Sequence, residues 1–208
     1  MHKSDLVRDI VDIEWPMFSG VNNLGGKASC QMDPQTFRIM RESQYATWSE
    51  ELLGRYLEDL RQAKQDGRNV MSEKYARMME HTFPDEFARL APRLPKLEPG
   101  AARMVEDIVA AHIKWKEEID AKYPALSERG RPLRSKDDYR FGQPSLETYM
   151  RGELQTLSPA AVAIYHRETM DRLAQGRNEA EENLLNQVKK YGFTSLEEAN
   201  QHVADNQA

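Results

Sequence analysis

Residues 101–123 read AARMVEDIVAAHIKWKEEIDAKY, and this stretch repeats its apolar residues with the period of an α-helix. Its stripe consists of residues three or four positions apart: Val105, Ile108, Val109, His112 and Ile113. Such spacing places side chains on one face of a helix. Nearly every other segment follows the same period, and no run of β-branched residues alternates as a half-buried strand does. The sequence therefore predicts an all-α fold, a compact bundle.

Capping residues and prolines indicate where the other helices begin. Asp33-Pro34 combines a capping side chain with proline at the first helical position, which predicts a helix from there to about residue 46. Ser4, Thr47 and Ser72 are expected to begin three further helices. Pro16 lacks an N–H, so we expect it to kink or end the first helix. These signals divide the chain into about eight helices.

Two segments interrupt the helical pattern. Residues 91–100, APRLPKLEPG, are punctuated by proline and are predicted to form a linker or a wall over the core. Residues 127–145 form a long arginine-rich loop, and a loop of that length in a compact domain is often functional or mobile. We predict that both lie within one helical domain spanning residues 1–208, the simplest organisation for a chain of this size.

The composition excludes several classes of protein. The net charge is −5 with both signs interleaved, whereas a general nucleic-acid binder presents a basic face. A single cysteine forms no internal disulfide, which fits a reducing cytosol. The N-terminal apolar run contains acidic residues, which a signal peptide does not. No segment contains a run of about 20 apolar residues, the length needed to span a bilayer. We therefore expect a cytoplasmic protein with no nucleic-acid and no membrane partner.

Four polar side chains interrupt apolar helical stripes. They have apolar neighbours three or four positions away, and they are Glu14, Arg41, Gln44 and Glu153. A buried charge left without its partner costs about 3–5 kcal/mol, so we expect Arg41 to meet Glu14, Glu153 or both. Two interpretations stay open. One is a structural salt bridge, and the other is a pocket in which one carboxylate stays ionised while the second acts as an acid or base.

The segment before the Asp33-Pro34 helix carries the only cysteine and the only Gly-Gly pair of the chain. Gly25 and Gly26 permit a positive φ that side chains resist. Cys30 and Gln31 directly precede the helix, and a thiol near a helix N-terminus can become nucleophilic. The alternative is that Cys30 is a small buried hydrophobic residue.

Metal and cofactor motifs are missing from the sequence. His112 and His166 lie on apolar helix faces and, with Glu14 and Glu153, have the composition of a two-metal bundle. Such bundles carry Glu-x-x-His on two helices, and here no glutamate stands three residues before a histidine. Dinucleotide, nucleoside-triphosphate, zinc-protease and hydrolase signatures are also missing. We expect no metal and no cofactor.

The loop at 127–145 concentrates positive charge. Five basic residues fall within twelve positions, namely Arg129, Arg131, Arg134, Lys136 and Arg140. One interpretation is a solvated surface. The other is that Arg131 and Arg134 close over a carboxylate or phosphate through bidentate hydrogen bonds.

Several motifs resemble a bacterial family catalogued as domain of unknown function 4125. They are EWPMF (14–18), GGKASCQMD (25–33), TFRIMRESQ (36–44), TWSEELL (47–53), EKYARMME (73–80), RPLRS (131–135) and LETYMRGEL (146–154). The resemblance covers most of the chain and implies a bacterial cytosolic protein, with no reaction attached. The motif positions include Glu14, Cys30, Gln31, Arg41, Gln44, Arg151 and Glu153.

The sequence predicts a small-molecule enzyme or ligand binder that acts on an anionic metabolite. Its candidate catalytic residues are Glu14, Glu153 and Cys30, and its candidate substrate-binding residues are Gln31, Arg41, Gln44, Arg131 and Arg134. An alternative is a non-catalytic helical module that docks on another enzyme, such as a nucleotidyltransferase, which the family resemblance suggests. A further alternative is a metal-dependent helical bundle.

Overall fold

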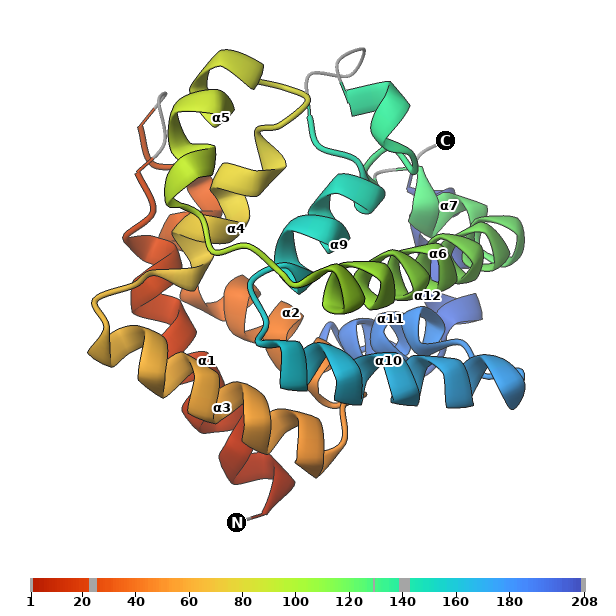
Figure 1. Cartoon of the computed structure of the whole chain (residues 1–208). Coiled ribbons are helices and arrows are strands. Elements are labelled where there is room, and N and C mark those ends of the chain that lie inside the picture. Colours follow the sequence, from red (N-terminus) through yellow and green to blue (C-terminus); the bar gives the residue numbers. More distant parts are fainter. Residues whose placement is uncertain (1, 23–25, 129, 139–142, 207–208) are drawn as a thin grey trace.

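A computed structural model describes residues 2–22, 26–128, 130–138 and 143–206. Within these ranges the fold is all-α, as predicted, with no strand and with eleven α-helices in place of the expected eight. The four-residue helix α7 accounts for part of the difference, because it is too short to show a clear period. The α-helices are α1 (Lys3–Ser19), α2 (Pro34–Tyr45), α3 (Glu50–Gln65), α4 (Val70–Met78), α5 (Pro84–Leu90), α6 (Pro99–Lys122), α7 (Pro124–Ser127), α9 (Leu146–Leu154), α10 (Pro159–Ala174), α11 (Glu179–Lys190) and α12 (Leu196–Asp205). Three 3₁₀ turns, η1 (Ser29–Met32), η2 (Ala91–Arg93) and η3 (Ser135–Asp137), connect them (Figure 1).

Helix α1 continues through Pro16, so of the two expected effects, a kink or an end, the helix end does not occur there. The proline removes the hydrogen bond to the carbonyl of Asp12, one turn back. Beyond it, Met17 and Phe18 are buried in the core, and this burial offsets the lost bond. Ser4 is not the cap either, because it lies inside the helix and His2 holds the N-cap position.

Two other predicted caps are displaced by a few residues. Ser49, in place of Thr47, caps α3 by accepting a hydrogen bond from the Leu52 N–H. Asn69, in place of Ser72, caps α4 in the same way. Thr47 is occupied elsewhere, because its hydroxyl donates to a buried glutamate. Asp33 caps α2 as predicted, accepting from the Thr36 N–H at 2.9 Å.

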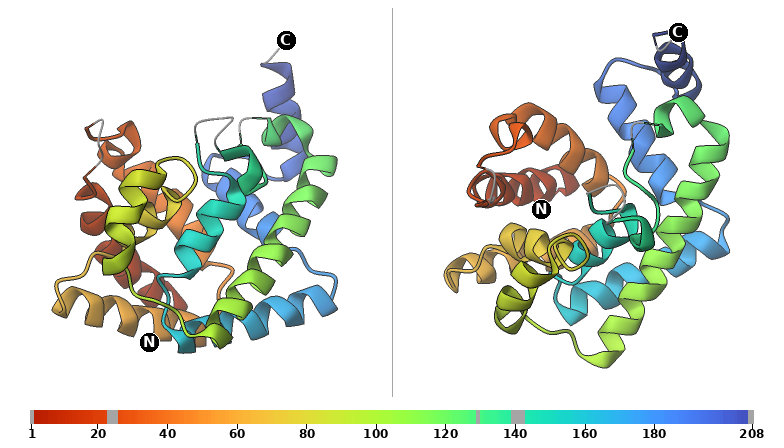
Figure 2. Two further views of the ribbon diagram at one scale, coloured as in Figure 1. Left: turned by 45° about the horizontal axis from the view of Figure 1, so that its top comes forward. Right: turned by 90° about the horizontal axis from the view of Figure 1, so that it is seen from above.

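The long helix α6 joins two hydrophobic clusters. Its first half contributes Val105, Ile108 and Val109 to a large core that also includes residues of α1, α3, α9 and α10. Its last turns pack Ile119 into a smaller cluster with residues of α11 and α12. Figure 2 shows α6 running along one side of the molecule, with α10 crossing it and α12 at its far end. The single domain over residues 1–208 stays a prediction, and the shared helix favours it.

The two non-periodic segments are partly structured. Residues 91–93 form η2, and α6 begins at Pro99, two residues earlier than expected. The 127–145 segment contains η3 and is tied down at Asp138, whose buried carboxylate accepts from the Ser145 N–H at 2.7 Å and the Thr148 hydroxyl at 2.5 Å. Arg129 and Arg140 lie outside the described residues. None of the described helices has the length and hydropathy to cross a membrane.

Candidate functional site

Arg41 of α2 lies between two glutamates that are distant in sequence. Its Nε and Nη2 donate to the two carboxylate oxygens of Glu14 on α1, at 2.8 and 2.6 Å, and its Nη1 donates to Glu153 of α9 at 2.6 Å. The three residues are at most 6% exposed. The expectation that Arg41 meets Glu14, Glu153 or both is confirmed, and it meets both. We call Glu14, Arg41, Gln44, Tyr45, Tyr56, Lys74 and Glu153 the buried network.

Three members of the buried network were not singled out as site residues. The hydroxyls of Tyr45 and Tyr56 donate to Glu14 Oε1 at 2.5 and 2.7 Å, and Lys74 Nζ of α4 donates to Glu153 Oε2 at 2.8 Å. The signal for Lys74 was in the sequence, because Val70 and Met78 stand four positions on either side of it. The two tyrosines lie on apolar helical stripes, where an aromatic ring is expected as part of the core, so the sequence carries no signal for their hydroxyls.

The charges within the buried network hold each other ionised. Burial opposes the ionisation of Glu153, but Arg41 and Lys74 outweigh it and set its pKa well below the usual range. Burial likewise works against the charged form of Lys74, yet Glu153 raises the Lys74 pKa above its ordinary value. Burial and the Glu14 carboxylate raise the pKa of the Tyr56 phenol well above its usual range. We therefore expect an ionised Glu153, a charged Lys74 and a neutral Tyr56 at neutral pH.

Arg41 has no N–H donor left for a substrate. A guanidinium carries five N–H groups. In Arg41 two of them meet Glu14, one meets Glu153 at 2.6 Å, one meets Gln44 Oε1 at 2.8 Å, and the fifth meets the Tyr45 hydroxyl. All five are used, so an anion can bind Arg41 only by displacing one of these partners. This geometry is that of a closed structural network.

Cys30 and Gln31 differ in their surroundings. Gln31 is buried, and its amide Nε2 donates to the carbonyls of Phe18 and Val21 at 3.0 and 2.8 Å while its Oε1 accepts from the Ala28 N–H at 2.9 Å. It thereby fixes the segment after α1 against the end of that helix. Cys30 is exposed, which excludes the buried-hydrophobe interpretation. Gly26 has the positive φ expected of it, whereas Gly25 lies outside the described residues.

The two loop arginines point to different places. Arg134 pairs with Glu117 of α6 at 2.7 Å on the surface. Arg131 donates to the carbonyl of Pro144 at 3.0 Å, and its guanidinium carbon lies 5.1 Å from the centre of the Tyr149 ring, over which Lys74 Nζ also lies, at 3.7 Å. Arg131 therefore stands next to the buried network without joining its hydrogen bonds.

The candidate metal ligands are not gathered in one place. His112 is buried and its Nε2 lies 3.0 Å from the Tyr165 hydroxyl, whereas His166 pairs with Asp107 at 3.1 Å. Burial and the nearby Arg172 lower the pKa of His112 to about 4. Among the described residues no three His, Cys, Asp or Glu side chains are grouped to hold a metal ion.

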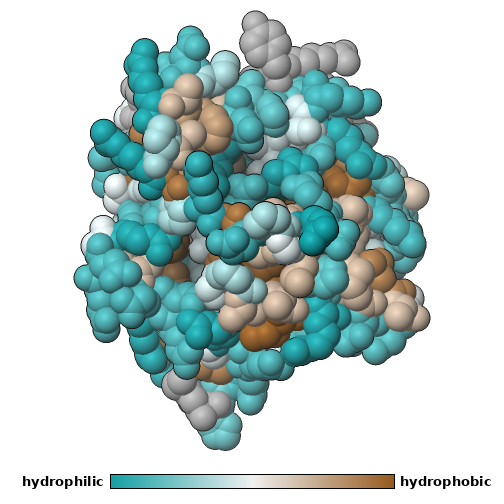
Figure 3. Space-filling view, in the orientation of Figure 1, coloured by the Kyte–Doolittle hydropathy of each residue, from teal (hydrophilic) through white to brown (hydrophobic). Residues whose placement is uncertain are grey.

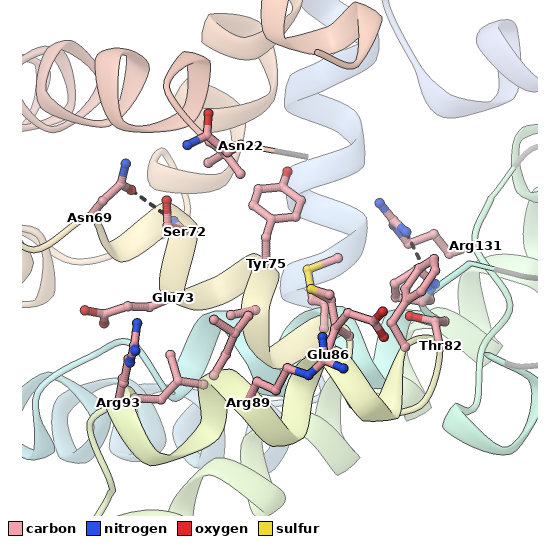
Figure 4. A pocket seen from close by; sticks show the side chains of 18 residues that line it. Asn22, Asn69, Ser72, Glu73, Tyr75, Thr82, Glu86, Arg89, Arg93 and Arg131 are labelled. Atoms are coloured by element: carbon pink, nitrogen blue, oxygen red, sulfur yellow. Dashed lines mark hydrogen bonds between the residues drawn. The ribbon is translucent and has the colours of Figure 1, made fainter. Parts of the chain in front are cut away.

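A cavity of about 920 Å³ lies beside the buried network, between α4 and α5. One wall is the α4 face formed by Ser72, Tyr75 and Ala76, and the opposite wall comes from α5. Figure 4 shows Tyr75 reaching into the space, with Glu86 and Arg89 on the α5 side and Arg131 at one end. Of the predicted site residues, Arg131 alone belongs to its described lining. We call this space the α4–α5 cavity.

The rim of the α4–α5 cavity includes two exposed large hydrophobic residues. Phe83 and Leu90 line it and are 50% and 36% exposed, although they are large hydrophobic residues. Figure 3 shows a small group of hydrophobic residues over α5, and further hydrophobic groups at the centre and the right of the same face. Exposed apolar groups gathered at a concave site are typical of a binding surface.

A comparison with known protein families identifies the family of this chain. A family model described as protein of unknown function (DUF4125) matches residues 4–201 of the 208. The chain belongs to this family. No curated protein and no solved structure matches it.

Membership in the family confirms the resemblance carried by the motifs and adds no activity. The motif EKYARMME (73–80) lies in the part of the chain that supplies both Lys74 of the buried network and the α4 wall of the α4–α5 cavity. The catalytic roles of Glu14, Glu153 and Cys30 stay predictions, as do the substrate-binding roles of the other candidates.

Proposed function

We propose that this protein binds a small, largely apolar molecule in the α4–α5 cavity. The observation that carries the proposal is the combination of volume and lining. Pockets for small molecules measure about 300–1,000 Å³ and are mostly apolar with a few polar groups, and a cavity of about 920 Å³ falls in that range. The family resemblance and the single cysteine support a bacterial, cytosolic setting for this binding.

In this proposal the buried network supports the cavity and does not perform chemistry. Lys74 anchors α4 to α9 through Glu153, and Arg41 connects the same carboxylate to α1 and α2. The neighbouring face of α4, which includes Ser72, Tyr75 and Met79 at the end of the helix, is thereby held toward α5. A rigid wall lowers the free energy lost in ordering a binding site.

A helical docking module is the second candidate, and the exposure of Phe83 and Leu90 favours it. A partner protein would cover the same apolar rim. The two candidates predict different contacts with the α4–α5 cavity. A small molecule fills the space beside Ala76, whereas a docking partner covers only the opening of the cavity.

Binding of Nile red, a neutral fluorescent dye, tests the proposal. We expect the dye to bind the wild-type protein with a blue-shifted emission, and Ala76→Trp to abolish this because the indole fills the cavity. Ala110→Trp on the exposed side of α6 is the matched control and should bind like wild type. Ser72→Trp provides a second blocking variant if thermal unfolding shows that Ala76→Trp is not folded. Unchanged dye binding in a folded blocking variant would overturn the proposal.

A further inference from the structure

We infer that the ligand of the α4–α5 cavity is an amphipathic anion, with an aliphatic or aromatic body and a carboxylate or similar group held by Arg131. The inference rests on the proposed function and adds the chemical class of the ligand. It follows from the charges of the lining, from the position of Arg131 and from the apolar wall opposite it.

The apolar wall suits a hydrocarbon body. Ala76, Met78 and Met79 on the α4 side face Phe83 and Leu90 on the α5 side. Methionine is flexible and polarisable, so it adapts to irregular apolar ligands. No charged group is needed along this part of the ligand.

The charges of the lining are unbalanced in favour of cations. Arg89 and Arg93 line the cavity and form no ion pair or hydrogen bond through their side chains with any described residue. Of the two lining carboxylates, Glu73 is already paired with Arg68 through two hydrogen bonds at 2.9 and 2.8 Å. With Arg131, three cations thus face one unpaired carboxylate, Glu86, in a protein whose net charge is −5. A positively charged cavity on a protein of negative net charge raises the local concentration of anions at that cavity.

Arg131 is the best placed of the three arginines. Its hydrogen bond to the Pro144 carbonyl at 3.0 Å and its position over the Tyr149 ring fix the guanidinium at one end of the cavity (Figure 4). Both partners are uncharged, so the positive charge is not neutralised and four N–H groups are left after the bond to Pro144. A fixed guanidinium binds a carboxylate in a bidentate manner with less loss of side-chain entropy than a free one.

Arg41 and Arg134 do not offer the same site. Arg41 has no free N–H, and Arg134 is paired with Glu117 on the surface, outside the cavity lining. The sequence predicted that Arg41, helped by Arg131 or Arg134, binds an anionic group, and we propose this role for Arg131 without Arg41.

The experiment displaces Nile red with three ligands of equal chain length, each below its micelle concentration: decanoate, decanol and decyltrimethylammonium. We expect decanoate to displace the dye at about tenfold lower concentration than either of the others, the effect of one charge-assisted contact. Arg131→Met should remove this preference and leave displacement by decanol within about twofold. Arg134→Met, in the same loop, is the control and should keep the preference. Arg131→Lys, which retains the charge, should keep part of it.

The outcomes distinguish failure of the anionic ligand class from failure of ligand binding in the α4–α5 cavity. If decanol displaces the dye as well as decanoate does, and Arg131→Met changes neither, the anionic class is wrong while the cavity still binds ligands. If Nile red does not bind at all, the proposed function fails. On the wild-type protein alone, added sodium chloride should weaken displacement by decanoate and not by decanol, and equal effects on both would also contradict the anionic class.

Discussion

Replacing Arg41 by methionine tests whether the buried network organises the fold. The substitution keeps much of the length of the side chain and removes all five N–H donors. Glu153 keeps Lys74 at 2.8 Å, but Glu14, which is 0% exposed, is left with two tyrosine hydroxyls and no cation. Breaking a buried ion pair by removing one partner costs about 3–5 kcal/mol. For a chain of this size, 1 kcal/mol corresponds to about 2–4 °C, so the melting temperature should fall by about 6–20 °C.

Arg134→Met supplies the matched comparison. Arg134 forms an ion pair of 2.7 Å, close to the distances in the buried network, but its side chain and that of Glu117 are 44% and 52% exposed. An exposed pair contributes about 0–1 kcal/mol, so this variant should melt close to wild type. Thermal unfolding followed by circular dichroism at 222 nm measures both.

A rescue variant identifies the cause of the loss. In Arg41→Met/Glu14→Gln the stranded charge is gone, and we expect about 1–3 kcal/mol of the lost stability to return. The reasoning is refuted if Arg41→Met and Arg134→Met melt together, or if the added Glu14→Gln change brings no recovery.

Three further predictions concern pH and packing. The Glu153 pKa is lowered well below 4.5, because Arg41 and Lys74 outweigh burial. Its stabilisation is therefore present above pH 4.5 and is lost gradually as the pH falls below that value, and urea unfolding should show the gap between wild type and Glu153→Gln narrowing steadily over this acidic range. The Glu179 pKa is raised above 4.5, chiefly by burial, so its stabilisation is present below that pH and is lost as the pH rises through the folded-state pKa. Glu179→Gln should flatten the stability profile in the range just above pH 4.5, measured by urea unfolding. A Cβ on Gly152 would lie 3.2 Å from a carbonyl oxygen of α4, so Gly152→Ala should cost about 1–3 kcal/mol, whereas Gly54→Ala meets nothing within 4 Å and should stabilise α3 by up to about 1 kcal/mol.

The buried network could be predicted because a charge on an apolar stripe has few alternatives to pairing. The neighbours of Glu14, Arg41 and Glu153 at three and four positions placed all three inside, and their opposite charges then required that they meet. The same rule applied to Lys74 would have completed the set. The sequence did not decide whether Arg41 meets one glutamate or both, because that depends on how α1, α2 and α9 pack.

The α4–α5 cavity could not be predicted in this way. Its walls depend on the distance and angle between two helices, and α5 has seven residues with none of them buried, so it shows no apolar stripe that would reveal its orientation.

The helix caps illustrate a related limit of prediction from sequence. Ser72 and Asn69 are both good capping residues by type, and only the folded backbone shows that the Asn69 side chain reaches an orphan N–H of α4.

The position of α4 connects the ionic interior to the cavity. A buried ion pair is a poor source of stability, since its desolvation offsets most of its attraction, but it has a strict geometric requirement. Lys74 meets Glu153 only when α4 has one rotation about its axis, and in that rotation Ser72, Tyr75 and Met79 face α5. If positions 74 and 153 held apolar residues instead of Lys74 and Glu153, α4 would pack acceptably in several rotations about its axis. Gly152 adds to the constraint, because its lack of a side chain lets α9 approach the α4 backbone closely at Lys74. We therefore propose that the charges in the core fix the orientation of a cavity wall, because Lys74 of the buried network stands in α4 between two cavity-lining residues, Glu73 and Tyr75.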